Sequence, residues 1–74
     1  MLYLFEIWHC DGMDKAILKD VKITDGIVRG TQVGVFEGYN THGDGSPIYA
    51  PCDPREYIAG GGAFTLVEFK EELA

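Results

Sequence analysis

The sequence is poor in basic residues. Only six Lys and Arg stand against twelve Asp and Glu, which gives a formal net charge of −6. The basic residues are spread along the chain, whereas binding to a phosphate backbone draws on clustered lysine and arginine. The composition therefore excludes direct nucleic-acid binding and favours a basic partner, such as a nucleic-acid-binding protein.

Cysteines and long apolar runs are also scarce. Two cysteines, Cys10 and Cys52, are too few for a disulfide framework. No stretch approaches the roughly 20 apolar residues of a membrane helix. The first residues reach Glu6 without a basic segment and a long apolar stretch, so no signal peptide is expected. We expect a cytoplasmic protein with reduced thiols and no membrane contact.

What the sequence does contain is enough apolar surface to fold. Hydrophobic residues make up 46% of the 74 residues, with four Tyr, four Phe and one Trp. A chain of this length supports one hydrophobic core, so we expect a single β-rich domain over residues 1–74. One flat sheet would leave an apolar face in water. The sheet is therefore expected to curl into a barrel or to be covered by a second copy, which makes a homo-oligomer possible.

Alternation of side chains predicts the strands. Residues 2–9 alternate with Glu6 as their only acidic residue, which is typical of a central strand buried on both faces. Asp25-Gly26 predicts a two-residue hairpin turn between strands at 16–24 and 27–37, with Ile23 opposite Val28. Residues 63–70 alternate again and predict a last strand.

Glycine and proline predict where these strands bend or stop. Glycines at 30, 34 and 38 lie on one side of an extended chain, and they favour a bulge near Gly30 and tight bending. Residues 39–53 are predicted to form a long loop. A capping box at residues 53–56 predicts a short helix near 54–59, which Gly60–Gly62 end. The fold class expected is mainly β: a small, strongly curved antiparallel sheet or barrel of about five strands.

No group of residues carries a firm catalytic or metal signature. Zinc could be bound by His9, Cys10, His42 and Cys52, but His9 and Cys10 are adjacent and would point to opposite faces of a strand. A thiol nucleophile at Cys52 would need a histidine and a carboxylate beside it. The sequence only supplies these residue types, so neither catalysis nor a metal or other cofactor is predicted.

The predicted function is therefore binding without catalysis. Aromatic residues are enriched at binding hot spots, and two tyrosines flank or lie within the predicted polar loop. We expect an inhibitor or adaptor, of the kind that phages and mobile elements encode, that blocks a macromolecular partner through its acidic surface and the 39–53 loop. The alternatives are a small-ligand-binding homo-oligomer and a structural subunit of a larger assembly. The candidate binding residues are Trp8, Glu37, Tyr39, His42, Asp44, Tyr49 and Tyr57.

Overall fold

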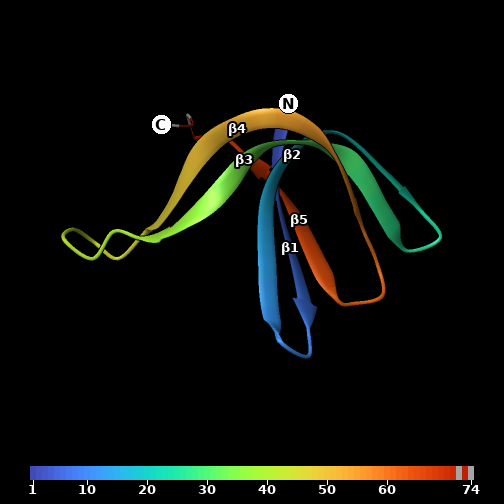
Figure 1. The fold of residues 1–74 in the computed structure, drawn as a ribbon, viewed down its shortest axis with the longest axis horizontal. Helices are drawn as coiled ribbons and strands as arrows, with labels where there is room; N and C mark the ends of the chain where they lie inside the picture. The colour runs from blue at the N-terminus through green and yellow to red at the C-terminus, as the bar shows by residue number, and fades with distance from the viewer. Residues whose placement is uncertain (72, 74) are drawn as a thin grey trace.

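The computed structural model describes residues 1–71 and 73, and its regular structure is a single antiparallel sheet (Figure 1). The strand order across the sheet is β4-β3-β2-β1-β5. This described part contains no helix, and so none that is long and apolar enough to cross a membrane. The strands are β1 (Leu2–His9), β2 (Gly12–Thr24), β3 (Ile27–Tyr39), β4 (Pro47–Ala59) and β5 (Phe64–Phe69).

The hairpin between β2 and β3 forms as the sequence predicts. Ile23 lies opposite Val28, and the chain turns through Asp25 and Gly26, whose φ angles are 53° and 76°. Positive φ at both central residues is the geometry of a two-residue turn whose twist matches that of the strands. The prediction for this turn is therefore confirmed.

The pairing of β2 with β3 is interrupted opposite Gly30. The register shifts between Lys19 and Lys22, and Asp20 in this interval has a φ of 54°. The bulge expected near Gly30 thus lies on the partner strand. A Cβ atom added to Gly30 would lie 3.0 Å from the carbonyl oxygen of Lys19, so glycine permits this close approach of two backbones.

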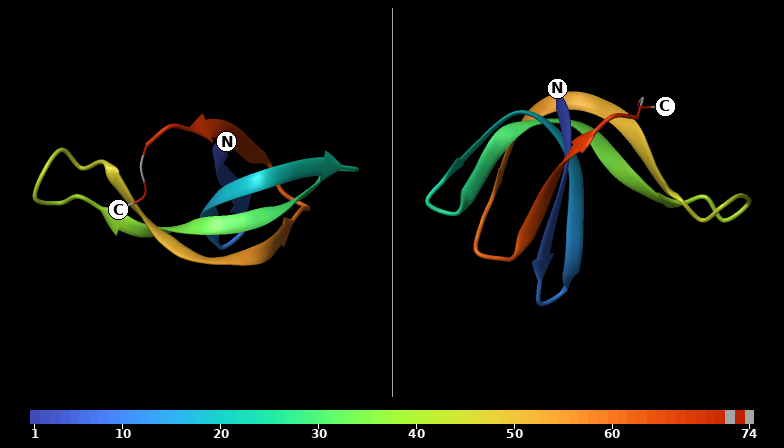
Figure 2. Two further views of the ribbon diagram at one scale, coloured as in Figure 1. Left: turned by 90° about the horizontal axis from the view of Figure 1, so that it is seen from above. Right: turned by 180° about the vertical axis from the view of Figure 1, so that it is seen from behind.

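The sheet remains open. The prediction of a barrel or strongly curved sheet is wrong, because β4 and β5 form opposite edges and β5 pairs, within the described part of the chain, with β1 alone (Figure 2). Side chains of the two edges still meet: the rings of Tyr49 and Phe69 have centroids 5.3 Å apart. The bulges therefore bend the long strands, but the sheet does not close into a barrel.

The predicted helix near residues 54–59 is absent, because this segment belongs to β4. Gly30 lies opposite Tyr57 and Arg29 opposite Ile58, so the segment is paired with β3. A capping box contributes only about 1 kcal/mol, less than the pairing and packing that a strand gains here. The predicted 39–53 loop is likewise shorter, since only residues 40–46 connect β3 to β4.

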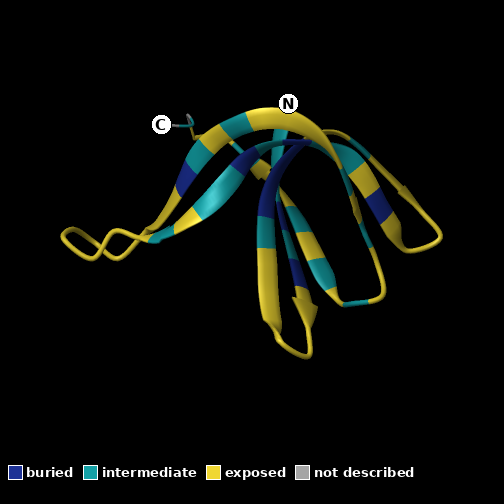
Figure 3. Ribbon diagram, in the orientation of Figure 1, coloured by how far each residue is buried: buried dark blue, intermediate teal, exposed yellow. Residues whose placement is uncertain are grey.

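The hydrophobic core lies on one face of the sheet. Phe5, with no exposed surface, is its centre, and the rings of Tyr57 and Phe64 lie 5.7 and 5.6 Å from it. Dark blue segments in Figure 3 mark the buried parts of the strands. The other buried members are Ile7, Ala16, Leu18 and Val28, and Val21, Ala59 and Leu66 pack against them.

The opposite face has a smaller buried region. Ile17, which is fully buried, lies beside Leu4 on β1 and Gly34 on β3. Alternation along β1 and β5 places Trp8 and Val67 on this same face, where 44% and 52% of their surfaces are exposed. Both faces thus bury apolar residues, but the second leaves several uncovered.

Candidate functional site

The residues predicted to bind a partner fall into two separate regions. One is the end of the β3–β4 hairpin, residues 36–50, called the arm below, whose tip extends away from the other strands in Figure 1. The other is a groove beside Gly60–Gly62, called the glycine groove. The arm contains Glu37, Tyr39, His42, Asp44 and Tyr49, whereas Trp8 and Tyr57 line the glycine groove.

Hydrogen bonds fix the turn at the tip of the arm. The N–H of Asn40 donates to the carbonyl of Ser46 at 2.8 Å, and the N–H of Gly45 donates to the carbonyl of Asn40 at 3.0 Å. The carboxylate of Asp44 accepts the N–H of Ser46 at 2.9 Å. The hydrogen bonds from Ser46 hold the pKa of Asp44 below its usual value, so this exposed acid stays charged.

Aromatic rings stiffen the base of the arm. The ring of Phe36 lies 5.2 Å from that of Tyr39 and 5.9 Å from that of Tyr49, between ring centroids. Tyr49 is 7% exposed, and burial is the main reason that its pKa is raised above 10.0. Tyr49 is therefore a packing residue of the arm, and its exposed neighbour Tyr39 is the one available for binding.

One lysine ties the arm to the rest of the sheet. The ammonium group of Lys15 on β2 lies 4.7 Å from the ring centre of Phe36 and 5.6 Å from that of Tyr39. It also forms an ion pair with Glu6 at 3.5 Å, and only 11% of the Lys15 side chain is exposed. The cation–π contacts orient the arm. The ion pair with Glu6 neutralises the positive charge of Lys15 within the protein.

The outer surface of the arm is apolar and acidic. Tyr39 and Ile48 are 54% and 39% exposed. Glu37 and Asp44 are its acidic residues, and residues 36–50 contain no lysine or arginine. An arm that exposes apolar side chains and carries acidic residues without basic ones is suited to a partner that combines apolar and basic groups.

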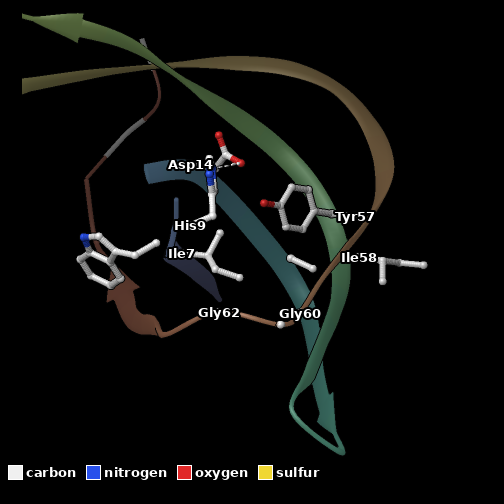
Figure 4. Close-up of a pocket in the computed structure, with 10 residues that line it drawn as sticks. Ile7, His9, Asp14, Tyr57, Ile58, Gly60 and Gly62 are labelled. Atoms are coloured by element: carbon white, nitrogen blue, oxygen red, sulfur yellow. Dashed lines mark hydrogen bonds and ion pairs between the residues drawn. The ribbon is translucent and has the colours of Figure 1, made fainter. Parts of the chain in front are cut away.

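The glycine groove is a cavity of about 450 Å³ between the β1–β2 hairpin and the segment that joins β4 to β5 (Figure 4). Its polar groups come from His9, Asp14 and Tyr57, whose hydroxyl points toward the other two in Figure 4. The remaining lining residues are Ile7, Trp8, Ile58, Ala59, Gly60, Gly61 and Gly62.

Strand register brings the polar groups of this groove together. Ile7 is opposite Asp14 and His9 is opposite Gly12, so His9 and Asp14 are diagonal neighbours on one face. Nε2 of His9 lies 3.1 Å from Oδ2 of Asp14, a distance at which the ring N–H donates to the carboxylate. Burial, and to a smaller extent the charge of Asp14, raise the pKa of Tyr57, so its hydroxyl stays protonated and can donate.

Close backbone contact explains the glycines beside the groove. A Cβ atom on Gly62 would collide with the carbonyl oxygen of Trp8. The N–H of Trp8 donates to the carbonyl of Ala63 at 2.9 Å, which holds this segment against the end of β1. The side chain of Trp8 lies on the other face from Ile7 and His9, so its backbone is what closes the groove.

The chemistry available in the glycine groove is hydrogen bonding and charge. Its lining residues, all within the described part of the chain, include no serine, cysteine or lysine that could act as a nucleophile. Cys10 is exposed at the β1–β2 turn, and Cys52 on β4 is half-buried. Among residues 1–71 and 73, no three His, Cys, Asp or Glu side chains gather in a way that could hold a metal ion.

Sequence reasoning missed Asp14 and the role of Gly60–Gly62 in this groove. The three glycines are interpreted from the sequence as the end of a helix, and only the pairing of β4 with β3 reveals them as a wall of a cavity. A hairpin placed at Cys10 and Asp11 would have brought His9 and Asp14 to one face.

Comparison of the chain with models of protein families, with curated proteins and with solved structures finds no match.

Proposed function

We propose that this chain is a non-enzymatic binding protein that engages a basic macromolecular partner through the arm. The observation that carries the proposal is the composition of the exposed arm, which presents Tyr39 and Ile48 to solvent and contains Glu37 and Asp44 but no lysine or arginine. Aromatic side chains in such positions contribute about 2 kcal/mol or more when an interface buries them. An inhibitor or adaptor in the cytoplasm is the role that we assign.

Charge determines the kind of partner. The net charge of −6 opposes contact with a phosphate backbone and attracts proteins that present lysine and arginine. Lys15, which contacts the base of the arm, is already held by Glu6 and Phe36, so it does not neutralise the acidic residues of the arm for an incoming partner. Nucleic-acid-binding proteins are one class with the required basic surface.

The test is affinity capture from the host cell, followed by quantitative mass spectrometry. The wild-type chain is compared with a variant that combines Tyr39→Ser and Ile48→Ser. The control variant combines Ile23→Ser and Ile27→Ser, which also removes two exposed apolar side chains, 50% and 38% exposed, but outside both the arm and the glycine groove. Circular dichroism and thermal unfolding verify that both variants fold.

We expect the partner to be enriched equally by the wild type and the control, and its affinity for the arm variant to fall at least about tenfold. Charge reversal of Glu37 and Asp44 should slow association and reduce its dependence on salt. A partner that binds the arm variant as tightly as the wild type would refute the arm as the binding surface.

A small-ligand function is the second candidate, favoured by the volume of the glycine groove. About 450 Å³ lies within the range of sites for small molecules, and polar groups from His9, Asp14 and Tyr57 converge on it. A ligand at 100 times its dissociation constant would raise the free energy of unfolding by about 2.7 kcal/mol. Thermal unfolding with a set of metabolites tests this candidate, with Asp14→Asn as the variant expected to lose the shift.

A further inference from the structure

β5 is an edge strand, and strand register determines which of its backbone groups face outward. The N–H of Trp8 donates to the carbonyl of Ala63, and the β1–β5 register continues from this pair. In an antiparallel ladder, hydrogen-bonded residues alternate along each strand. Thr65 and Val67 therefore direct their N–H and C=O groups toward β1. Phe64, Leu66 and Glu68 direct theirs away from the sheet.

The two edges of the sheet differ in their capacity to accept another strand. Pro47, Pro51 and Pro54 all lie in β4, and a proline has no N–H to donate. Prolines on an edge strand protect it from pairing with another chain. β5 contains no proline, so each of its outward residues offers both a donor and an acceptor. The edge of β5 is thus the one that can be extended.

A groove runs beside this edge. Its volume is about 330 Å³, and its apolar lining comes from Leu4, Tyr49, Val67 and Phe69. Val67 lies opposite Leu4 across the β1–β5 pair, but 52% of its surface remains exposed in the groove. The remaining lining residues are Pro47, Glu68, Lys70 and Glu71. An apolar lining with the carboxylate of Glu71 beside it fits the alkyl chain and the charged end of a lysine or arginine.

We propose that an extended segment of a partner protein, carrying lysine or arginine at alternate positions, pairs antiparallel with the free edge of β5. The backbone of the partner segment forms hydrogen bonds with the backbone groups of Phe64, Leu66 and Glu68, and its basic side chains lie over the groove. This is recognition by strand addition, in which the backbone supplies affinity and pockets for alternate side chains supply specificity. The inference rests on the proposed function, since it requires a protein partner, but concerns the edge of β5 and its groove, which share only Pro47 and Tyr49 with the arm.

Charge favours a basic segment over a second copy of this chain at the edge. Two copies would each bring a net charge of −6, and β5 with the residue after it contains Glu68 and Lys70, which already form an ion pair at 3.9 Å. Glu71 also lines the groove, and its charge contributes to the raised pKa of Tyr49. A basic segment is attracted to Glu71 and to the net negative charge of the chain, whereas a second acidic chain is repelled.

The experiment uses an octapeptide of alternating lysine and valine as the probe, titrated onto the whole chain. Two further peptides carry N-methyl groups, one on every lysine and the other on every valine. They have equal charge and equal numbers of methyl groups, but each lacks donors on only one backbone edge. Amide hydrogen exchange measured by nuclear magnetic resonance reports which residues of β5 the peptide protects.

We expect the unmethylated peptide to slow exchange at the amides of Leu66 and Glu68 at least about tenfold. One methylated peptide should bind like the unmethylated one, and the other at least about tenfold more weakly. Equal binding of both methylated peptides, or binding without protection of these amides, would mean that charge alone attracts the probe and would overturn the proposal. So would no binding at all.

Two controls separate this inference from its alternatives. Protection of Leu66 and Glu68 that rises with protein concentration, without peptide, would show that a second copy occupies the edge and would overturn the proposal. The variant Ile48→Ser should bind the peptide unchanged, because Ile48 is not among the residues that line the groove and its side chain lies on the other face from Pro47 and Tyr49. If the peptide fails to bind while the arm still captures its partner, this inference fails and the proposed function stands.

Discussion

Replacement of Gly34 by alanine tests the packing between β2 and β3. An added Cβ atom would lie 2.9 Å from Cβ and 3.0 Å from Cγ1 of Ile17, and 3.1 Å from Cδ2 of Leu73. Ile17 is fully buried, and Gly34 is held between Ile17 on one side and Pro51 on the other. β3 is paired with β2 on one side and with β4 on the other, so Gly34 cannot move away from Ile17 without disturbing a pairing. We therefore expect Gly34→Ala to lower the free energy of unfolding by about 1–3 kcal/mol.

Urea denaturation followed by circular dichroism measures this loss. The matched control is Gly60→Ala, where the nearest atom is Cγ1 of Ile27 at 3.3 Å, on a side chain that is 38% exposed and can move. This control should change the free energy of unfolding by no more than about 0.5 kcal/mol. The melting temperature of Gly34→Ala should fall by about 4–8 °C for each kcal/mol lost.

A double-mutant cycle identifies the contact responsible. Ile17→Ala alone should cost about 2–5 kcal/mol, because it leaves a cavity. In the double variant the contact with Cγ1 at 3.0 Å is gone while the contact with Cβ at 2.9 Å remains, so the clash is relieved in part and the two costs should sum to at least about 0.5 kcal/mol more than the measured loss. Strict additivity would assign the clash to Cβ of Ile17 or to Leu73, and a neutral Gly34→Ala would refute the claim that Ile17 and Gly34 are in close contact.

The remaining predictions concern the β2–β3 turn and the tyrosine of the glycine groove. Gly26→Val should cost about 1 kcal/mol or more, because φ at Gly26 is 76°, and an unchanged urea midpoint would show that the turn tolerates side chains. Burial and then Asp14 raise the pKa of Tyr57 above 10.0, so its protonated form favours the folded state. Its contribution to stability is complete below pH 10 and is lost as the pH rises through the raised pKa. Urea midpoints from pH 9 to 11.5 should fall less steeply for Tyr57→Phe, and parallel curves would contradict this assignment.

Local signals in the sequence were sufficient for several strands. The alternation over residues 2–9 and 63–70 corresponds to β1 and, within one residue at each end, to β5. The Asp25-Gly26 turn predicted the register of β2 and β3 next to the turn, from Thr24 and Ile27 to Lys22 and Arg29, because two positive φ angles are cheap only for a few residue types. In each case the residues of one short segment determine the local structure without contacts from elsewhere in the chain.

Long-range pairing accounts for what the sequence did not reveal. The capping box near Asp53 is a real local signal, but pairing with β3 and the contact between Tyr57 and Phe5 override it. Sheet closure was also unpredictable, since three glycines indicate close approach without saying whether the edges meet. The rings of two candidate binding residues, Tyr49 and Tyr57, pack in different regions, and Tyr57 also lines the glycine groove, which alternation alone cannot predict.

The pairing of β1 with β5 has a consequence for how the molecule folds. It joins Leu2 to Phe69, whereas each of the other strand pairs joins neighbours in the chain through a short turn. The three hairpins can form while the ends of the chain are still apart, but the last pairing pays the entropy of a loop of nearly the whole length. The rate-limiting step of folding should therefore be this meeting of the two ends, and a flexible linker that joins them should accelerate it.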